Sequence, residues 1–271
     1  MVWGHIAAQI IHLKACGIQR ISISIDGSNA ESHDAFRRQP GAFEAALRGI
    51  ENAKAAGIEF QINTTITKHN RTQIPDILDM AVSIGAAALH IFLLVPTGRG
   101  REMKGEAVEG EEYERVLHWF YEQREKVPFQ LKATCAPHYY RILRQRARGE
   151  GKKVTPQTHG LDAVTRGCLG GIGFLFISHR GDVQPCGYLE AFSGSVRQQR
   201  LRDIWETSPV FRQLRDFSAY RGRCGRCEYK NVCGGCRARA YAVTGDYMAE
   251  EPYCTYVPKK MRNQESGERK Q

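Results

Sequence analysis

The sequence predicts an α/β fold followed by a small cysteine-rich domain. Apolar, β-branched segments alternate with segments of helical periodicity through the first half of the chain. Seven of the nine cysteines lie after residue 165, where short strands and turns replace that alternation. The composition of the 271 residues, 42% hydrophobic and 25% charged, is ordinary for a globular protein with a real core.

The first half contains four predicted strands with predicted helices between them. The strands are residues 20–26, 58–67, 88–98 and 129–135, and the helices are residues 41–57, 74–86 and 111–127. Short connections between strand and helix imply βαβ units and a parallel sheet, either open or closed into a barrel. In both arrangements ligands bind at the carboxyl ends of the strands.

The second half changes character after the fourth predicted strand. Residues 141–160 are charged and contain Gly and Pro, which predicts a linker or an exposed loop. A hairpin is expected from strands at 172–178 and 182–185, and an amphipathic helix at 201–217.

The chain shows no run of about 18 apolar residues and no signal-peptide pattern, so we expect a cytoplasmic location and no membrane partner. In a reducing compartment, clustered thiols bind metal more often than they form disulfides. The odd number of cysteines also argues against a fully paired disulfide framework.

The net charge of +10 is compatible with plain solubility or with a polyanionic partner, either a nucleic acid or a small molecule with several carboxylates. Lys and Arg are dense at residues 141–153 and in the tail, but they form no stripe interleaved with aromatic residues. This arrangement argues against nucleic acid as the partner.

The stretch "CGRCEYKNVCGGC" gives the strongest motif, two C-x2-C pairs at residues 224–236. Each pair allows two thiolates to reach one metal centre from a tight turn. Its glycines permit positive φ and allow backbone N–H groups to point toward sulfur. A closed zinc site and an iron–sulfur cluster both use four such ligands, so the spacing alone leaves both open.

The whole cysteine pattern, C-x12-G-x4-C, then C-x2-C-x5-C-x2-C, then a last Cys, closely resembles the SPASM domain of radical SAM enzymes. That family usually has three residues in the last gap, where this chain has only Gly234 and Gly235. The stretch "RISISIDGSNAESHDAFRRQPGAFEAALRGIENAKAAGIEFQINTTITKHN" resembles the fourth and fifth strands of a radical SAM barrel.

Three further stretches, "LHIFLLVPTGRGRE", "LKATCAPHYYRI" and "CGRCEYKNVCGGCRARAYAVTGDYMAEEPYC", are most similar to enzymes that trim side chains of iron-tetrapyrroles in heme d1 biosynthesis and in the siroheme-dependent route to heme. The resemblance implies a partial (β/α)6 barrel, its C-terminal half, over residues 1–140 and a SPASM domain over residues 166–256. A linker at 141–165 and a basic tail at 257–271 complete the expected organisation.

The chain lacks the C-x3-C-x2-C motif that binds the cluster cleaving S-adenosylmethionine (AdoMet) in this family. Cys16 stands alone, expected as a small buried helix residue, and the next cysteine is Cys135. We therefore expect a chain truncated at its N-terminus that is poorly stable or prone to aggregate, because a sheet edge is bare. Whether it is an enzyme by itself is left open.

The resemblance also assigns ligands to two auxiliary 4Fe–4S clusters. One is expected on Cys224, Cys227, Cys233 and Cys254. The cluster nearer the substrate is expected on Cys168, Cys186 and Cys236, with Cys135 as its fourth ligand. The alternative is that Cys135 is an ordinary buried thiol and that the fourth iron site is open for substrate.

Five other residues receive roles from the same resemblance. Ser24, Asp26 and Asn63 are expected near the methionine and ribose parts of AdoMet, with Asp26 otherwise a plain turn residue. His138 and Arg141 are expected to contact a substrate carboxylate, or else to lie on the linker surface.

The implied chemistry is radical. One electron reduces AdoMet, and the resulting 5′-deoxyadenosyl radical takes hydrogen from a propionate or acetate side chain of the tetrapyrrole. The implied partners are an anionic tetrapyrrole and an electron donor such as ferredoxin or flavodoxin. Two alternatives remain, a radical SAM/SPASM peptide maturase and a non-enzymatic zinc-ribbon protein that binds nucleic acid.

Overall fold

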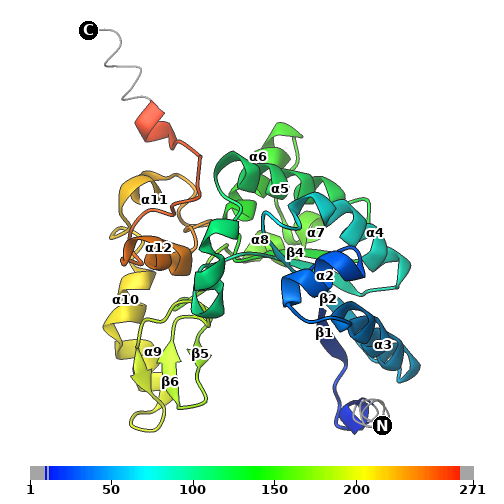
Figure 1. The fold of residues 1–271 in the computed structure, drawn as a ribbon. Helices are drawn as coiled ribbons and strands as arrows, with labels where there is room; N and C mark the ends of the chain where they lie inside the picture. The colour runs from blue at the N-terminus through cyan, green and yellow to red at the C-terminus, as the bar shows by residue number, and fades with distance from the viewer. Residues whose placement is uncertain (1–9, 11, 263–271) are drawn as a thin grey trace. The chain divides into compact units, whose positions relative to one another are not determined.

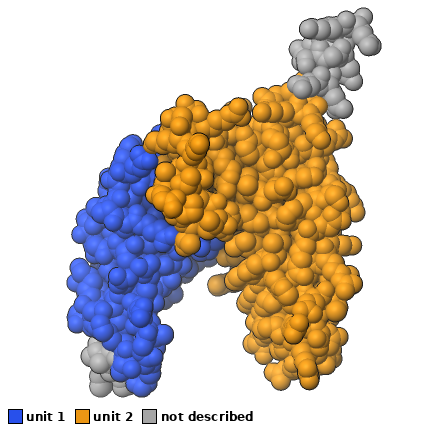
Figure 2. All heavy atoms as spheres, turned by 180° about the vertical axis from the view of Figure 1, so that it is seen from behind, with its two compact units in different colours: residues 1–94, 106–108, 122–134 blue, residues 95–105, 109–121, 135–271 orange. Residues whose placement is uncertain are grey.

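The structure, a computed structural model, describes residue 10 and residues 12–262. The chain divides into two compact units, coloured separately in Figure 2. Unit 1 extends to residue 94 and takes in residues 106–108 and 122–134. Unit 2 comprises residues 95–105, 109–121 and the chain from residue 135 onward. No described helix is long and apolar enough to cross a membrane.

Unit 1 is built on a four-stranded parallel sheet with the order β1-β2-β3-β4 (Figure 1). The strands are β1 (Arg20–Ser24), β2 (Glu59–Ile66), β3 (Ala88–Leu93) and β4 (Gln130–Thr134). The helices of this unit are α2 (Ala30–Arg37), α3 (Ala42–Ala55) and α4 (Ile74–Ser83), with a 3-10 turn η1 (Arg71–Gln73). The predicted α/β fold, its parallel sheet and its strand–helix alternation are confirmed.

The two faces of this sheet differ because side chains alternate along each strand. In β2, Phe60, Ile62, Thr64 and Ile66 are buried, and the residues between them are exposed or half-buried. Helix α3 contacts β1 and β2, and α4 contacts β3, so the apolar face is covered by helices. The opposite face carries a polar row in register, listed strand by strand: Ser24, Asn63, His90 and Lys132.

Unit 2 combines helices with a small antiparallel sheet. The longer helices are α5 (Gly110–Gln123, within this unit to residue 121) and α6 (His138–Gly149); short helical segments are η2 (Gly98–Glu106), α7 (Pro156–His159) and α8 (Leu161–Val164). The sheet contains β5 (Phe176–Ile177), β6 (Asp182–Gln184) and β7 (Gly194–Ser195). The remaining helices are α9 (Leu201–Thr207), α10 (Pro209–Arg215), α11 (Gly222–Arg226) and α12 (Arg237–Thr244).

Three local predictions are wrong. Residues 141–149 are not an exposed loop but part of α6, which buries Arg141, Ile142 and Leu143. Its four arginines obscured an amphipathic pattern in the sequence. The helix predicted at 201–217 is two helices, because Pro209 begins α10 and the residue before a proline, Ser208, adopts an extended ψ of 127°. Cys16 is exposed rather than buried.

Candidate metal centres

Four thiols of unit 2 line a single pocket. They are Cys224, Cys227, Cys233 and Cys254, called here the first thiol group. Cys224 lies in α11 and Cys227 caps it, so one short helical turn presents both sulfurs. Burial raises the pKa of the Cys254 thiol to about 12, and burial also raises the pKa values of Cys227 and Cys233.

Backbone N–H groups point at three of these sulfurs. Gly235 donates to Cys233 Sγ, Tyr229 to Cys227 Sγ and Glu251 to Cys224 Sγ, each at 3.4 Å. Gly234 and Gly235 have φ values of +74° and +63°, so the expected left-handed turn in "CGGC" is confirmed. Such donors favour thiolate over thiol and tune a bound metal centre.

The other four thiols of unit 2 form a second thiol group, Cys135, Cys168, Cys186 and Cys236. Burial raises the pKa of Cys135, and the charges of Cys236, Cys186 and Cys168 raise it further, which shows that the four lie close together. Burial likewise raises the pKa of Cys236 to about 12 and that of Cys186 to about 11. Thiolates this close together would repel one another, so a positively charged metal centre among them would stabilise all four.

Cys135 has an unusual backbone. Its φ is +55°, a left-handed value that costs a residue other than glycine about 1–2 kcal/mol. Its carbonyl oxygen accepts hydrogen bonds from Arg239 Nη2 at 3.0 Å and from Tyr113 Oη at 3.3 Å. Strain of this kind persists where surrounding contacts enforce it, and it is common at functional sites.

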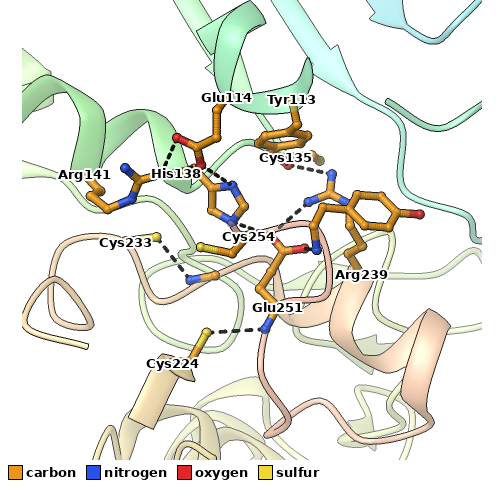
Figure 3. A network of polar contacts seen from close by, with 12 residues as sticks. Tyr113, Glu114, Cys135, His138, Arg141, Cys224, Cys233, Arg239, Glu251 and Cys254 are labelled. Atoms are coloured by element: carbon orange, nitrogen blue, oxygen red, sulfur yellow. Dashed lines mark hydrogen bonds and ion pairs between the residues drawn. The ribbon is translucent and has the colours of Figure 1, made fainter. Parts of the chain in front are cut away.

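A buried polar network lies beside both thiol groups (Figure 3). The Glu251 network consists of Glu114, His138, Arg141, Arg239 and Glu251. His138 Nε2 lies 2.6 Å from Glu251 Oε2, and Arg239 Nη1 donates to the same oxygen at 3.3 Å. On the other side of the imidazole, Nδ1 lies 3.7 Å from Glu114 Oε1, and Arg141 Nη2 donates to Glu114 Oε2 at 2.6 Å.

The network keeps an ionised carboxylate in the protein interior. Burial by itself would raise the pKa of Glu251, whose side chain is fully buried, but the charges of Arg239 and His138 outweigh burial and lower it. Arg239 is also fully buried, and its guanidinium lies over the rings of Tyr113 and Tyr253 at 5.2 and 5.0 Å. Removing either charge would leave the other buried and uncompensated, at a cost of about 3–5 kcal/mol.

His138 and Arg141 are 0% and 3% exposed, so the alternative that they lie on a linker surface is wrong. Both side chains contact carboxylates of the protein itself, Glu251 and Glu114. Their contact with a substrate carboxylate stays a prediction.

The spacing of donor atoms distinguishes zinc from a larger metal centre. A tetrahedral zinc ion with Zn–S bonds of about 2.3 Å places its sulfurs about 3.8 Å apart. Within the described residues, the donors that gather within 4.8 Å of one another are those of Glu114, His138 and Cys254, and no three thiols do so. Among the described residues, neither thiol group is therefore arranged as a preformed tetrahedral zinc site.

The predicted AdoMet residues lie in unit 1. Ser24 and Asn63 are register partners on the polar face of the sheet. Asp26 differs, because its side chain is buried and occupied by protein partners: Oδ1 accepts from the Thr65 N–H at 2.7 Å, and Oδ2 pairs with Arg37. Burial raises the pKa of this carboxyl, although Arg37 opposes the rise.

Residues 168–237 match the SPASM family, described as an iron-sulfur cluster-binding domain. The chain is 59% identical over 249 residues to "AdoMet-dependent heme synthase" of Nitratidesulfovibrio vulgaris, covering 92% of this chain and 68% of that protein. The chain belongs to the radical SAM/SPASM family, with the AdoMet-dependent heme synthases.

Other relatives extend this comparison. Proteins of the same name are 59% identical in Oleidesulfovibrio alaskensis and 56% identical in Methanosarcina barkeri, and the chain spans 64% and 70% of their lengths. The identity falls to 32% with "Pre-heme d1 synthase" of Dinoroseobacter shibae, where the alignment covers 93% of this chain and 65% of that protein.

A solved structure also shares the fold of this chain. The structure "Native anSMEcpe with bound AdoMet" has a TM-score of 0.61 with 16% identity, and the match covers 92% of this chain and 67% of that chain. Because the identity is only 16%, this likeness supports the fold and says nothing about activity.

The radical SAM/SPASM pattern did not reveal every residue that matters in these sites. Arg239, Glu251 and Tyr113 contact or position the peptide of Cys135, yet none belongs to a cysteine motif. Asn70 was also missed: its Nδ2 donates to the carbonyls of Asp26 and Thr65, each at 2.8 Å, and so fixes the ends of β1 and β2. Its place just after a predicted strand end was the available signal.

Proposed function

We propose that this chain belongs to a radical SAM enzyme that removes or modifies propionate or acetate side chains of an iron-tetrapyrrole. We also propose that unit 2 binds two auxiliary 4Fe–4S clusters. The observation that carries the cluster proposal is the division of eight thiols of unit 2 into two groups of four. The tetrapyrrole proposal comes from relatives named heme synthase, at 56% to 59% identity.

The cluster ligands are proposed group by group. The first thiol group, Cys224, Cys227, Cys233 and Cys254, holds one cluster. The second, Cys168, Cys186 and Cys236 with Cys135 as the fourth ligand, holds the cluster nearer the substrate. The left-handed backbone of Cys135 and its three thiol neighbours support its place as a ligand.

In unit 1 we propose that the four-stranded sheet is the C-terminal half of a (β/α)6 barrel, within residues 1–140, and that residues 166–256 form the SPASM domain. Ser24, the last residue of β1, and Asn63, its register partner within β2, would contact AdoMet from the polar face of the sheet. Asp26 would serve the same site indirectly, because it fixes the backbone of Thr65 on β2.

The bound clusters and AdoMet supply one-electron chemistry and a 5′-deoxyadenosyl radical, while the protein supplies binding and orientation. The thiols of unit 2 provide anionic ligands, and backbone N–H groups and arginines beside them offset that charge. A net charge of +10 suits a substrate with several carboxylates. A cytoplasmic electron donor such as ferredoxin or flavodoxin would complete the system.

An absorbance titration tests the substrate proposal. Anaerobically reconstituted protein is titrated with an iron porphyrin that carries free propionates and, as the matched ligand, with its methyl ester. We expect saturable one-to-one binding of the free acid. We expect the ester to bind at least about tenfold more weakly, because esterification removes the negative charges with which cationic side chains would pair. Equal binding of acid and ester, or no binding of either, would contradict the proposal.

A further inference from the structure

The peptide carbonyl of Cys135 is held by two buried donors of unit 2. Arg239 Nη2 donates to it at 3.0 Å from α12, and Tyr113 Oη donates at 3.3 Å from α5. Arg239 and Tyr113 are both fully buried. The carbonyl that they hold belongs to a residue with a φ of +55°. These two hydrogen bonds therefore fix the orientation from which the Cys135 side chain leaves the backbone.

Arg239 is in turn fixed by Glu251. Glu251 Oε2 accepts from Arg239 Nη1 at 3.3 Å and lies 2.6 Å from His138 Nε2, while Oε1 accepts from the N–H of Tyr253 at 3.2 Å. The carboxylate thus has partners on both oxygens and no exposure to solvent. Without its charge, the buried guanidinium loses its counterion and the contact that orients it toward Cys135.

The same residue touches the first thiol group through its backbone. The N–H of Glu251 donates to Cys224 Sγ at 3.4 Å. Figure 3 shows Glu251 with its backbone toward Cys224 and its side chain toward His138 and Arg239. The backbone N–H contacts Cys224, whereas the carboxylate contacts Arg239, which in turn contacts Cys135. A substitution that changes only the carboxylate therefore affects the contacts that lead to Cys135.

We propose that Glu251, acting through Arg239, is a positioning residue that holds Cys135 in its left-handed conformation so that the Cys135 thiol serves as the fourth ligand of the second thiol group. This inference rests on the proposed assignment of a cluster to Cys135, Cys168, Cys186 and Cys236. Its specific content is that the loss of the Glu251 charge releases one ligand and leaves the other three in place.

The chain offers a matched control for the Glu251 carboxylate. Glu250, the neighbouring carboxylate, pairs with Arg223, so Glu250→Gln makes the same chemical change away from Cys135. Arg239→Lys keeps the charge beside Glu251 but loses the donor to Cys135, and it is compared with the same Glu250→Gln control.

The experiment is alkylation with iodoacetamide after anaerobic reconstitution with iron and sulfide, followed by peptide mass mapping of each cysteine. Exposed Cys16 is labelled in every sample and serves as the internal standard. In the wild type, the four cysteines of the second thiol group are expected to be protected. In Glu251→Gln and Arg239→Lys, Cys135 is expected to be labelled about 10-fold faster, the scale on which supporting contacts affect metal sites. Cys168, Cys186 and Cys236 are expected to stay protected, and Glu250→Gln is expected to match the wild type.

Three outcomes would overturn the inference. The first is protection of Cys135 in both variants at the wild-type level, which leaves the cluster assignment intact and removes the role of Glu251. The second is simultaneous labelling of all four cysteines, which shows general loss of the site. The third is labelling of Cys135 in the reconstituted wild type at the rate of iron-free protein, which removes the fourth-ligand assignment itself.

Discussion

Cys233 and Cys236 are separated by only two residues, yet they belong to different thiol groups of unit 2. Cys233 faces the pocket that also contains Cys224, Cys227 and Cys254. Cys236 interacts electrostatically with Cys168 and Cys135. The left-handed Gly234 and Gly235 between them turn the chain so sharply that consecutive cysteines point to different sites.

The turn gives a first prediction. A Cβ at Gly235 would lie 2.4 Å from Arg237 Nη2 and 2.8 Å from Glu251 Cβ, so Gly235→Ala has both backbone strain and a steric conflict. Gly245, at the end of α12, has a similar φ of +76°, but a Cβ there would meet no heavy atom within 4 Å. We expect Gly245→Ala to lower the free energy of unfolding by about 1 kcal/mol.

Gly235→Ala should lower the free energy of unfolding by at least about 2 kcal/mol and should also reduce the iron content. Urea unfolding and iron analysis measure these two effects. Equal effects of the two substitutions would show that strain alone, without crowding beside Cys233, accounts for the need for glycine.

A second prediction distinguishes a structural role for Asp26 from a direct AdoMet-binding role for Ser24. Asp26→Ala removes the acceptor of the Thr65 N–H and the partner of Arg37, so it should destabilise the protein by about 1–3 kcal/mol. Ser24, which is exposed at the end of β1, should tolerate Ala within about 0.5 kcal/mol but lose AdoMet affinity. Thermal unfolding and calorimetric titration with AdoMet measure the two effects. Unchanged AdoMet affinity in Ser24→Ala would remove Ser24 from the proposed site.

The outcome for Asp26 shows what the sequence could predict. The strand end at "SIDG" was predictable from its apolar, β-branched run and the following glycine, and so was the partner strand that contains Asn63. The sequence could not show that the Asp26 carboxylate is buried against Thr65 and Arg37, because these contacts depend on how β1, β2 and α2 pack.

The same limit applies to the metal centres. The C-x2-C pairs and the glycine turn were predictable, because local spacing determines them. The contact between Cys135 and Arg239 joins residues 104 positions apart, beyond the reach of local patterns. Likewise, Glu250 and Glu251 are adjacent and identical in the sequence, but Glu250 pairs with Arg223 while Glu251 is fully buried.

A third prediction concerns AdoMet cleavage. The sequence contains no C-x3-C-x2-C motif, so this chain by itself should release no 5′-deoxyadenosine from AdoMet under reducing conditions, even after reconstitution. Chromatographic detection of 5′-deoxyadenosine, with the N. vulgaris relative as positive control, measures this. Release at a rate comparable with the relative would show that the chain cleaves AdoMet without that motif.

The central claim is that unit 2 holds two separate four-iron sites, and native mass spectrometry of reconstituted protein tests it most directly. The wild type should carry two clusters, about eight iron per chain, since each cluster takes four cysteines. The double variant Cys224→Ala/Cys227→Ala should keep only the cluster of the second thiol group, and Cys168→Ala/Cys186→Ala only that of the first. One cluster or two zinc ions in the wild type, or loss of all iron in either variant, would contradict two independent sites.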